Sequence, residues 1–204
     1  MKRLATFLML GALLLPNRGL ANAPDATVIH IQEGHVALEF VGQVNNTPTT
    51  SQQFGYLSNI EGLSPIFSSS TPQNETTASF TFVTNATTDR VISDGSLRII
   101  NRTGTTTIYL NSAPSDFSNP ASFSQGTPIQ VSTYRQQVIL NTTTNSFVTV
   151  HMNRITESEP FTLNGQLYQL GSEGRSFRTT YSGQANAPGL APSGWFAGYA
   201  VGAK

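Results

Sequence analysis

Apolar and polar side chains alternate along most of this chain, and this period of two residues constrains the fold more than any other feature. Strands have this period because successive side chains point to opposite faces of a sheet. After residue 23, no segment carries apolar residues at helical spacing for more than two turns, whereas Thr, Val, Ile, Phe and Tyr crowd short alternating runs. The sequence therefore predicts an all-β protein.

Turn residues predict how the strands connect. Asn164-Gly165 and Asp94-Gly95 suit two-residue hairpin turns, which need positive φ. Residues 85–89 and 141–145 are rich in Asn and Thr and read as loops. Some predicted strands are halves of one bent strand, so we expect about 8–11 strands in a single antiparallel β-barrel or β-sandwich with hairpin connections. The predicted strands span residues 27–32, 35–44, 53–59, 77–84, 90–93, 96–101, 105–111, 128–140, 146–157, 160–163, 166–170, 176–182 and 195–201.

Three further segments complete the predicted organisation. Residues 60–76 and 112–127 are two long loops, and Phe117 and Phe123 in the second favour a loop packed on the domain over a mobile lid. Residues 183–194 are rich in Gly, Ala and Pro and read as a tether. Small residues alternate with large ones in the segment that follows, so residues 195–204 are expected to form a last strand that closes the domain.

Residues 1–23 have the features of a secretory signal peptide. Lys2 and Arg3 precede an apolar run from Leu4 to Leu15, and Ala21-Asn22-Ala23 supplies small residues at cleavage spacing. No apolar run approaches the roughly 20 residues that a membrane-spanning helix needs, so no transmembrane helix is expected. We therefore expect a secreted or periplasmic protein, with its β domain over residues 24–182.

Composition excludes several classes of partner and site. Of the 11 Lys and Arg residues, Lys2, Arg3 and Arg18 lie in the leader, which leaves 8 basic and 11 acidic residues in the mature chain. This balance argues against binding to nucleic acid. The chain has no cysteine, which excludes thiol nucleophiles and thiolate metal sites. The sequence predicts no cofactor.

A candidate metal site lies near the start of the mature chain. If Glu33-Gly34 is a two-residue turn, strand 27–32 pairs with strand 35–44, and Ile29 lies opposite Leu38. The other face of this hairpin then collects His30, His35 and Glu39, whose nitrogen and oxygen atoms could bind a divalent metal. The alternative is a solvated outer face.

Evidence for catalysis is weaker. His151 lies on a predicted strand, but neither a nucleophile nor an orienting acid can be assigned to it. Glu157 and Glu159 share a strand face at glycosidase-like spacing, yet they adjoin Pro160 at a strand end, where solvation explains them. The chain carries no nucleophile elbow, P-loop, dinucleotide fingerprint or metalloprotease helix.

Aromatic and arginine side chains offer better material for binding than for catalysis. We expect a non-catalytic β domain that binds a small or extended ligand, with carbohydrate as one class, or a surface partner. One alternative is an architectural or adhesive subunit that uses its C-terminal strand for assembly. Another is a barrel enzyme whose cavity includes His151. The candidate ligand-binding residues are Tyr109, Phe117, Tyr134, Arg135, His151 and Trp195.

Overall fold

The computed structural model describes residues 25–29 and 33–203, and this part of the chain is built from strands and one short 3-10 helix. The predicted all-β class is confirmed. The strands are β1 (Thr27–Ile29), β2 (Val36–Asn46), β3 (Thr50–Ile60), β4 (Phe80–Asp94), β5 (Leu97–Leu110), β6 (Thr127–Asn141), β7 (Ser146–Ser158), β8 (Pro160–Leu163), β9 (Gln166–Leu170), β10 (Ser176–Ala185) and β11 (Gly194–Ala203), and the 3-10 helix is η1 (Pro120–Ser124).

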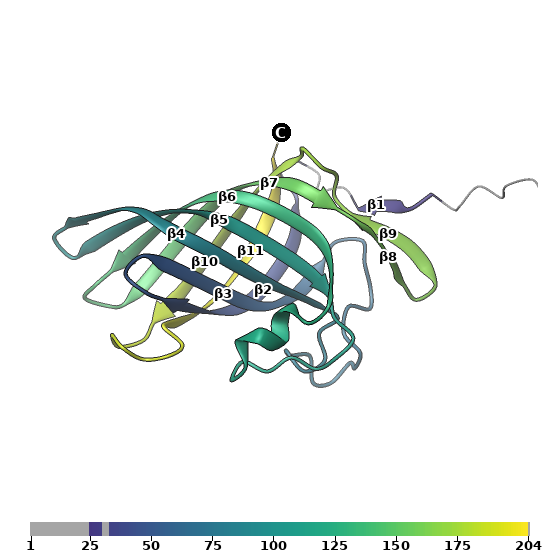
Figure 1. The fold of residues 1–204 in the computed structure, drawn as a ribbon, viewed down its shortest axis with the longest axis horizontal. Coiled ribbons are helices and arrows are strands. Elements are labelled where there is room, and N and C mark those ends of the chain that lie inside the picture. Colours follow the sequence, from purple (N-terminus) through teal and green to yellow (C-terminus); the bar gives the residue numbers. More distant parts are fainter. Residues whose placement is uncertain (1–24, 30–32, 204) are drawn as a thin grey trace, which may run out of the picture.

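Eight of these strands close into an antiparallel barrel in the order β10-β11-β2-β3-β4-β5-β6-β7, with β7 paired to β10 (Figure 1). Its hairpin turns lie together at one end, at the left of Figure 1. Alternation along each strand sends one set of side chains into the barrel and the other set outward. The barrel therefore has an interior that is separate from its outer face.

A small sheet of β1, β9 and β8 lies at the other end of the barrel (Figure 1). Phe161 and Leu170 of this sheet are buried in the main hydrophobic core, where the ring of Phe161 packs edge-on against Phe80 at 5.6 Å. Ile129 and Ile155 are also buried in this core. Apolar packing thus closes this end of the barrel.

The predicted hairpin between strands 27–32 and 35–44 is wrong. β1 pairs in parallel with β9, which sets Ile29 opposite Leu170. Leu38 lies opposite Ala200 on β11 and Ile60 on β3. Because barrel closure fills both edges of β2, no edge remains for the N-terminal strand.

Most predicted strands agree with the structure to within three residues, but two predicted breaks are absent. Residues 85–89 continue β4, with a register shift between Thr88 and Arg90, and β5 runs unbroken through Gly104. Asn164 and Gly165 both have positive φ, as predicted for their turn. The other turn is shifted by one residue: Asp94 pairs with Leu97, and Gly95 takes the positive φ. The Asn- and Thr-rich turn at 141–145 is confirmed at the β6–β7 connection.

The predicted tether is shorter than expected, because β10 continues to Ala185 and β11 begins at Gly194. The loop between them is also tied to the barrel. The N–H of Ser193 donates to the carbonyl oxygen of Val44 at 2.7 Å, and its hydroxyl accepts from the N–H of Asn46 at 2.9 Å. β11 itself is paired on both edges, with β10 and with β2.

The loop before β6 is packed onto the barrel, as the sequence predicted. Phe123 is fully buried with Phe54 and Val83, both of which face outward from the barrel wall. Its ring centroid lies 5.4 Å from that of Phe54 and 4.9 Å from that of Phe117. The hydroxyl of Thr81 donates to the carbonyl oxygen of Phe123 at 2.8 Å, so both the ring and the backbone of the loop are held.

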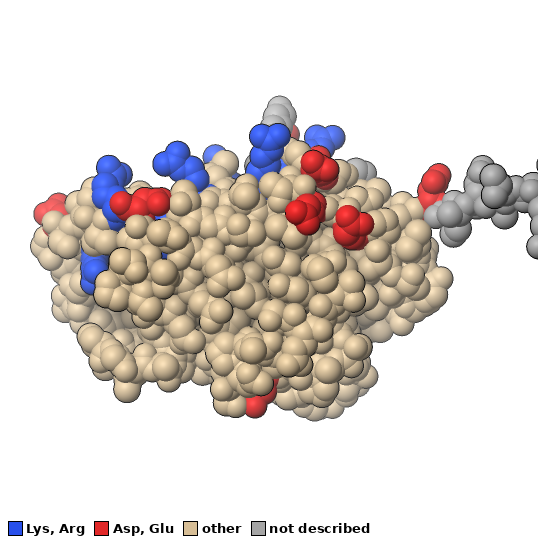
Figure 2. Space-filling view, viewed as in Figure 1, with Lys and Arg blue, Asp and Glu red and all other residues tan. Residues whose placement is uncertain are grey.

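Much of the outer surface is neutral. The face shown in Figure 2 carries its charged groups mainly along one edge. Thr103, Thr105 and Thr107 alternate along the outward side of β5 and supply polarity without charge. Among the described residues, no helix is long and apolar enough to cross a membrane.

Candidate functional site

The barrel interior contains a layer of buried polar side chains between apolar regions. Hydrophobic barrels usually exclude such groups unless hydrogen bonds compensate their lost hydration. The layer draws on five strands, and its members are Gln53 on β3, Arg102 on β5, Tyr134 and Gln136 on β6, Thr149, His151 and Asn153 on β7, and Tyr181 on β10. All eight are less than 9% exposed.

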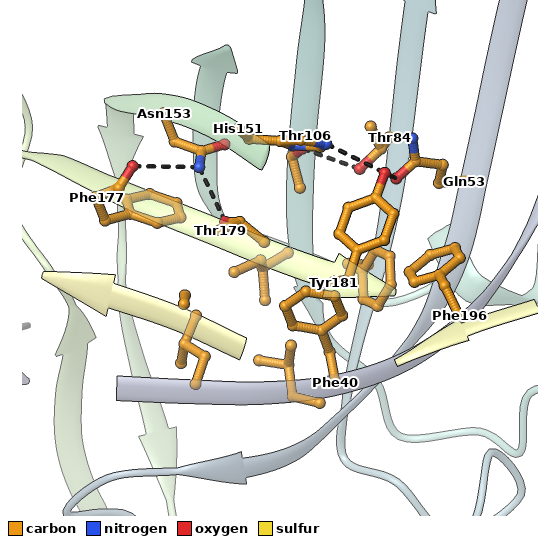
Figure 3. A pocket seen from close by; sticks show the side chains of 15 residues that line it. Phe40, Gln53, Thr84, Thr106, His151, Asn153, Phe177, Thr179, Tyr181 and Phe196 are labelled. Atoms are coloured by element: carbon orange, nitrogen blue, oxygen red, sulfur yellow. Dashed lines mark hydrogen bonds between the residues drawn. The ribbon is translucent and has the colours of Figure 1, made fainter. Parts of the chain in front are cut away.

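The hydroxyl of Tyr181 is the centre of this layer (Figure 3). It donates to Oε1 of Gln53 at 2.9 Å, as Figure 3 shows. It also accepts from Nε2 of Gln136 at 2.8 Å. It also lies 3.2 Å from Nε2 of His151. A phenol has one proton to donate, so with the proton given to Gln53 the imidazole Nε2 is the donor to Tyr181. Burial raises the pKa of Tyr181, which keeps this hydroxyl protonated.

His151 is held between two tyrosine rings. It stacks on Tyr134 with a centroid distance of 4.5 Å and an interplanar angle of 11°, and it meets Tyr181 edge-on at 5.3 Å. Burial, together with the positive charge of Arg102, lowers the pKa of His151 to about 3. The imidazole is therefore neutral at physiological pH.

Interior glycines make room for the rings of this layer. A β-carbon placed on Gly198 would lie 2.3 Å from the Tyr181 β-carbon, and one placed on Gly104 would lie 2.7 Å from the Tyr134 hydroxyl oxygen. Both distances are far below van der Waals contact, so the strand backbones approach the rings as only glycine allows. The positions of the two tyrosines thus depend on glycines in neighbouring strands.

Two small cavities adjoin the polar layer, and Gln53, Tyr181 and Phe196 line both of them. The inner cavity has a volume of about 50 Å³ and is bounded mainly by apolar side chains, with His151 and Asn153 on its polar side (Figure 3). The outer cavity has about 60 Å³ and is lined by Arg102 and Gln136. Among residues 25–29 and 33–203, no Asp or Glu lines either cavity.

The outer cavity leads toward the hairpin end of the barrel. Its wall includes Asn46, Leu140 and Ser193, which are partly or fully exposed and lie where strands run into turns. The opposite end is closed by the apolar packing around Phe161. A molecule from solution would therefore reach the polar layer from the hairpin end.

Four buried polar atoms in the barrel interior lack a hydrogen-bond partner: Oγ of Ser51, the hydroxyl oxygen of Tyr134, Oε1 of Gln136 and Oγ1 of Thr149. Of these residues, Gln136 and Thr149 line the outer cavity. Buried polar groups in native proteins are nearly always paired with protein, water or ligand. Gln136 is half satisfied, since its amide nitrogen binds Tyr181 while its oxygen is unpaired. A water molecule or a polar ligand would complete the hydrogen bonding of these atoms.

The predicted ligand-binding residues fall into separate places. Tyr134 and His151 stack within the barrel. Phe117 and Trp195 lie together on the outer face, with ring centroids 5.3 Å apart, and Tyr109 packs near them against the outer aromatic cluster. Arg135 is exposed on the outward side of β6. The structure thus brings only Tyr134 and His151 to the polar layer.

The predicted metal-binding residues cannot be assembled from the described chain. His30 lies outside the described residues, and His35 and Glu39 are both exposed. Glu39 lies opposite Tyr199 and Asn59 in the barrel wall. Within residues 25–29 and 33–203, no group of three or more His, Asp or Glu side chains is placed to hold a metal ion.

Several members of the polar layer were missed from the sequence, namely Gln53, Arg102, Gln136 and Tyr181. Strand parity placed Gln136 on the same face as Tyr134, and this was the available signal. It was insufficient, because parity alone does not say which face points inward.

A larger hollow of about 600 Å³ lies on the wall near the β2–β3 turn. Its lining includes Asn45, Gln52, Asn85 and Thr87, and it contains no aromatic ring on which a sugar could stack. It is therefore a weaker candidate site than the interior.

No protein-family model matches the chain, and no curated protein or solved structure matches it either. The candidate site therefore rests on the geometry of this chain.

Proposed function

We propose that this protein is an exported, non-catalytic β-barrel that binds a small ligand in its interior, reached from the hairpin end. Export is inferred from the basic residues, apolar run and small residues of segment 1–23. An outer face with few charged side chains (Figure 2) is compatible with a protein that works outside the cytoplasm.

The observation that carries the proposal is the unpaired Oε1 of Gln136, a residue that lines the outer cavity. An unsatisfied buried polar atom costs about 1–3 kcal/mol of folding free energy, so a group such as Gln136 Oε1 is expected to have a partner in the working state. A cavity of about 60 Å³ has room for about two water molecules, at the roughly 30 Å³ that each occupies in the liquid, or for one polar group of a small organic molecule.

The ionisation of His151 supports binding over catalysis. A general acid or base works best with a pKa near the operating pH. Burial lowers the pKa of His151 to about 3, so the imidazole is neutral and only weakly basic near pH 7. Its contacts with Tyr134 and Tyr181 fit a residue that shapes the site.

The pairing of β11 argues against assembly by strand donation. Both edges of this strand are hydrogen-bonded within the barrel, to β10 and to β2. Its inward residues Phe196 and Ala200 are buried in the core. Releasing the strand to a neighbour would open the barrel.

The proposal can be tested with the purified protein and four probes: propionate, propionamide, glycerol and glucose. We expect at least one probe to raise the melting temperature and to shift the NMR resonances of His151 and Tyr181, because only a molecule bound in the interior contacts that layer. A result in which no probe does either contradicts the proposal.

A matched pair of variants locates the binding. Val138 lines the outer cavity, and its neighbour Ile139 is 41% exposed on the other face of β6. Val138→Phe should fill the cavity and abolish the effect of the probe, while Ile139→Phe should leave it unchanged. Equal binding by both variants would place the ligand elsewhere. The resonance shifts in the unmodified protein keep the test decisive if Val138→Phe does not fold.

A further inference from the structure

Arg102 is a buried cation without an anionic partner among the residues that the structure describes. It lies on the inward side of β5 and is 6% exposed. Its Nη2 donates to Oδ1 of Asn46 at 3.1 Å, and its Nε donates to Oγ1 of Thr88 at 3.4 Å. Both acceptors are neutral oxygens. Since a guanidinium has five N–H groups, donors remain available for another molecule.

The surroundings of Arg102 carry positive charge and no described negative charge. Arg98 acts on it with a second positive charge, the neighbouring Tyr181 and Tyr134 are neutral phenols, and no described carboxylate lines its cavity. Arg98 lies on the same side of β5 as Arg102, four residues nearer the hairpin tip, and its side chain is exposed there. Asp89 is turned to the outer wall, where its carboxylate accepts from the hydroxyl of Thr103. Two cations therefore line the approach to the outer cavity.

A buried charge is costly unless an opposite charge compensates it. Arginine is also the side chain best suited to bind a carboxylate, because its planar fork donates two parallel hydrogen bonds. Gln136 lies directly opposite Arg102 across the β5–β6 ladder, and its unpaired Oε1 faces the same part of the interior. The ligand therefore needs an anionic group for Arg102, and the Gln136 amide oxygen, which only accepts, needs a hydrogen-bond donor beside that group, such as a hydroxyl or a water molecule.

We infer that the interior site takes a small organic carboxylate, whose anionic group binds Arg102 in the outer cavity. This inference rests on the proposed function, which requires only that some small ligand binds there. The cavity volume of about 60 Å³ limits the portion bound there to about two or three non-hydrogen atoms, the size of a carboxylate group. Tyr181 lies between this space and the inner cavity, which is lined mainly by apolar side chains. The alkyl chain of the carboxylate would extend toward that inner cavity.

The test compares propionate with propionamide, which has nearly the same shape and no charge. Titrations at constant ionic strength should show that propionate binds at least about tenfold more tightly, as expected when a charge-assisted hydrogen bond is lost. In the unmodified protein, propionate should shift the side-chain ¹⁵Nε resonance of Arg102. Inorganic phosphate is the third arm, and phosphate binding more tightly than propionate would overturn the assignment to a carboxylate.

Variants separate the inference from the proposed function. Arg102→Gln should weaken propionate binding at least about tenfold while changing propionamide binding by less than about threefold. Arg135→Gln, which removes an exposed arginine on the outer wall, should change neither. Equal binding of both probes, unaffected by Arg102→Gln, overturns the carboxylate inference and leaves the interior site intact. If neither probe binds the unmodified protein, the carboxylate inference fails, and the other probes decide the proposed function.

Discussion

His151 couples the stability of the barrel to pH, because its imidazole is buried without a carboxylate beside it. Its pKa is about 3 in the folded protein and about 6.5 where it is solvated. Below pH 6.5 the unfolded chain binds a proton at this site that the folded chain does not bind. Stability therefore falls as the pH is lowered from 6.5 toward 3, by roughly 3–5 kcal/mol over the whole range.

Urea denaturation at pH 7, 5 and 4 measures this dependence. The His151→Gln variant should lose much less stability than the unmodified protein between pH 6.5 and pH 4, because a neutral amide takes up no proton in this range. His35→Gln, which removes an exposed imidazole, is the matched control and should follow the unmodified protein. If His151→Gln and the unmodified protein lose the same free energy on acidification, the buried imidazole does not set the pH dependence.

The composition of β7 explains why single residues of the site were hard to predict. Its inward side carries Thr149, His151 and Asn153, whereas its outward side carries Val148, Val150 and Met152, which are 43–48% exposed. By hydrophobicity alone the outward side looks like the core. Tyr134 and His151 were selected for their chemistry, while the contacts that Tyr181 makes with Gln53 and Gln136 join strands far apart in the sequence.

At the scale of whole elements, the loop that contains η1 stabilises the outer wall of the barrel. Phe123 fills an apolar site over β3 and β4, and its backbone accepts the hydroxyl proton of Thr81. Phe123→Ala should lower the free energy of unfolding by about 3–5 kcal/mol, the usual cost of removing a buried aromatic ring. Chemical denaturation monitored by circular dichroism measures this change.

Phe117 in the same loop is the matched control, because it is only partly buried and packs on the surface of the cluster. Phe117→Ala should cost clearly less than Phe123→Ala. Equal and small effects of the two variants would mean that the loop contributes little to the wall.

Strand bounds were more predictable than strand partners. The pattern placed β6 at 128–140 and β8 at 160–163, against observed bounds of Thr127–Asn141 and Pro160–Leu163. The predicted break at residues 85–89 was wrong, because its Asn and Thr residues resemble a loop. In the barrel, these residues alternate between the outer wall and the interior, and Ala86 lies on the interior side. Local composition cannot separate these cases.

Barrel closure at the scale of the whole molecule depends on pairings between distant parts of the chain. The sequence left a barrel and a sandwich open as alternatives. Two strand pairings make the fold a barrel. β10 pairs with β7 across the β8–β9 hairpin, and β11 pairs with β2, although these two strands lie near opposite ends of the chain. Neither contact has a local signal, since a turn residue specifies only the hairpin that contains it.

β11 is therefore expected to be indispensable, and deletion of residues 194–204 tests this. The deletion exposes the edges of β10 and β2 and removes Phe196 and Ala200 from the core. The shortened chain should no longer unfold cooperatively in urea, and its NMR spectra should show poor chemical-shift dispersion. Deletion of residues 1–29 is the control at the other terminus, because β1 pairs only with β9 outside the barrel, and this variant should keep a cooperative transition. A C-terminally shortened protein that still unfolds cooperatively would show that seven strands suffice, and β11 would then be free to pair with another chain.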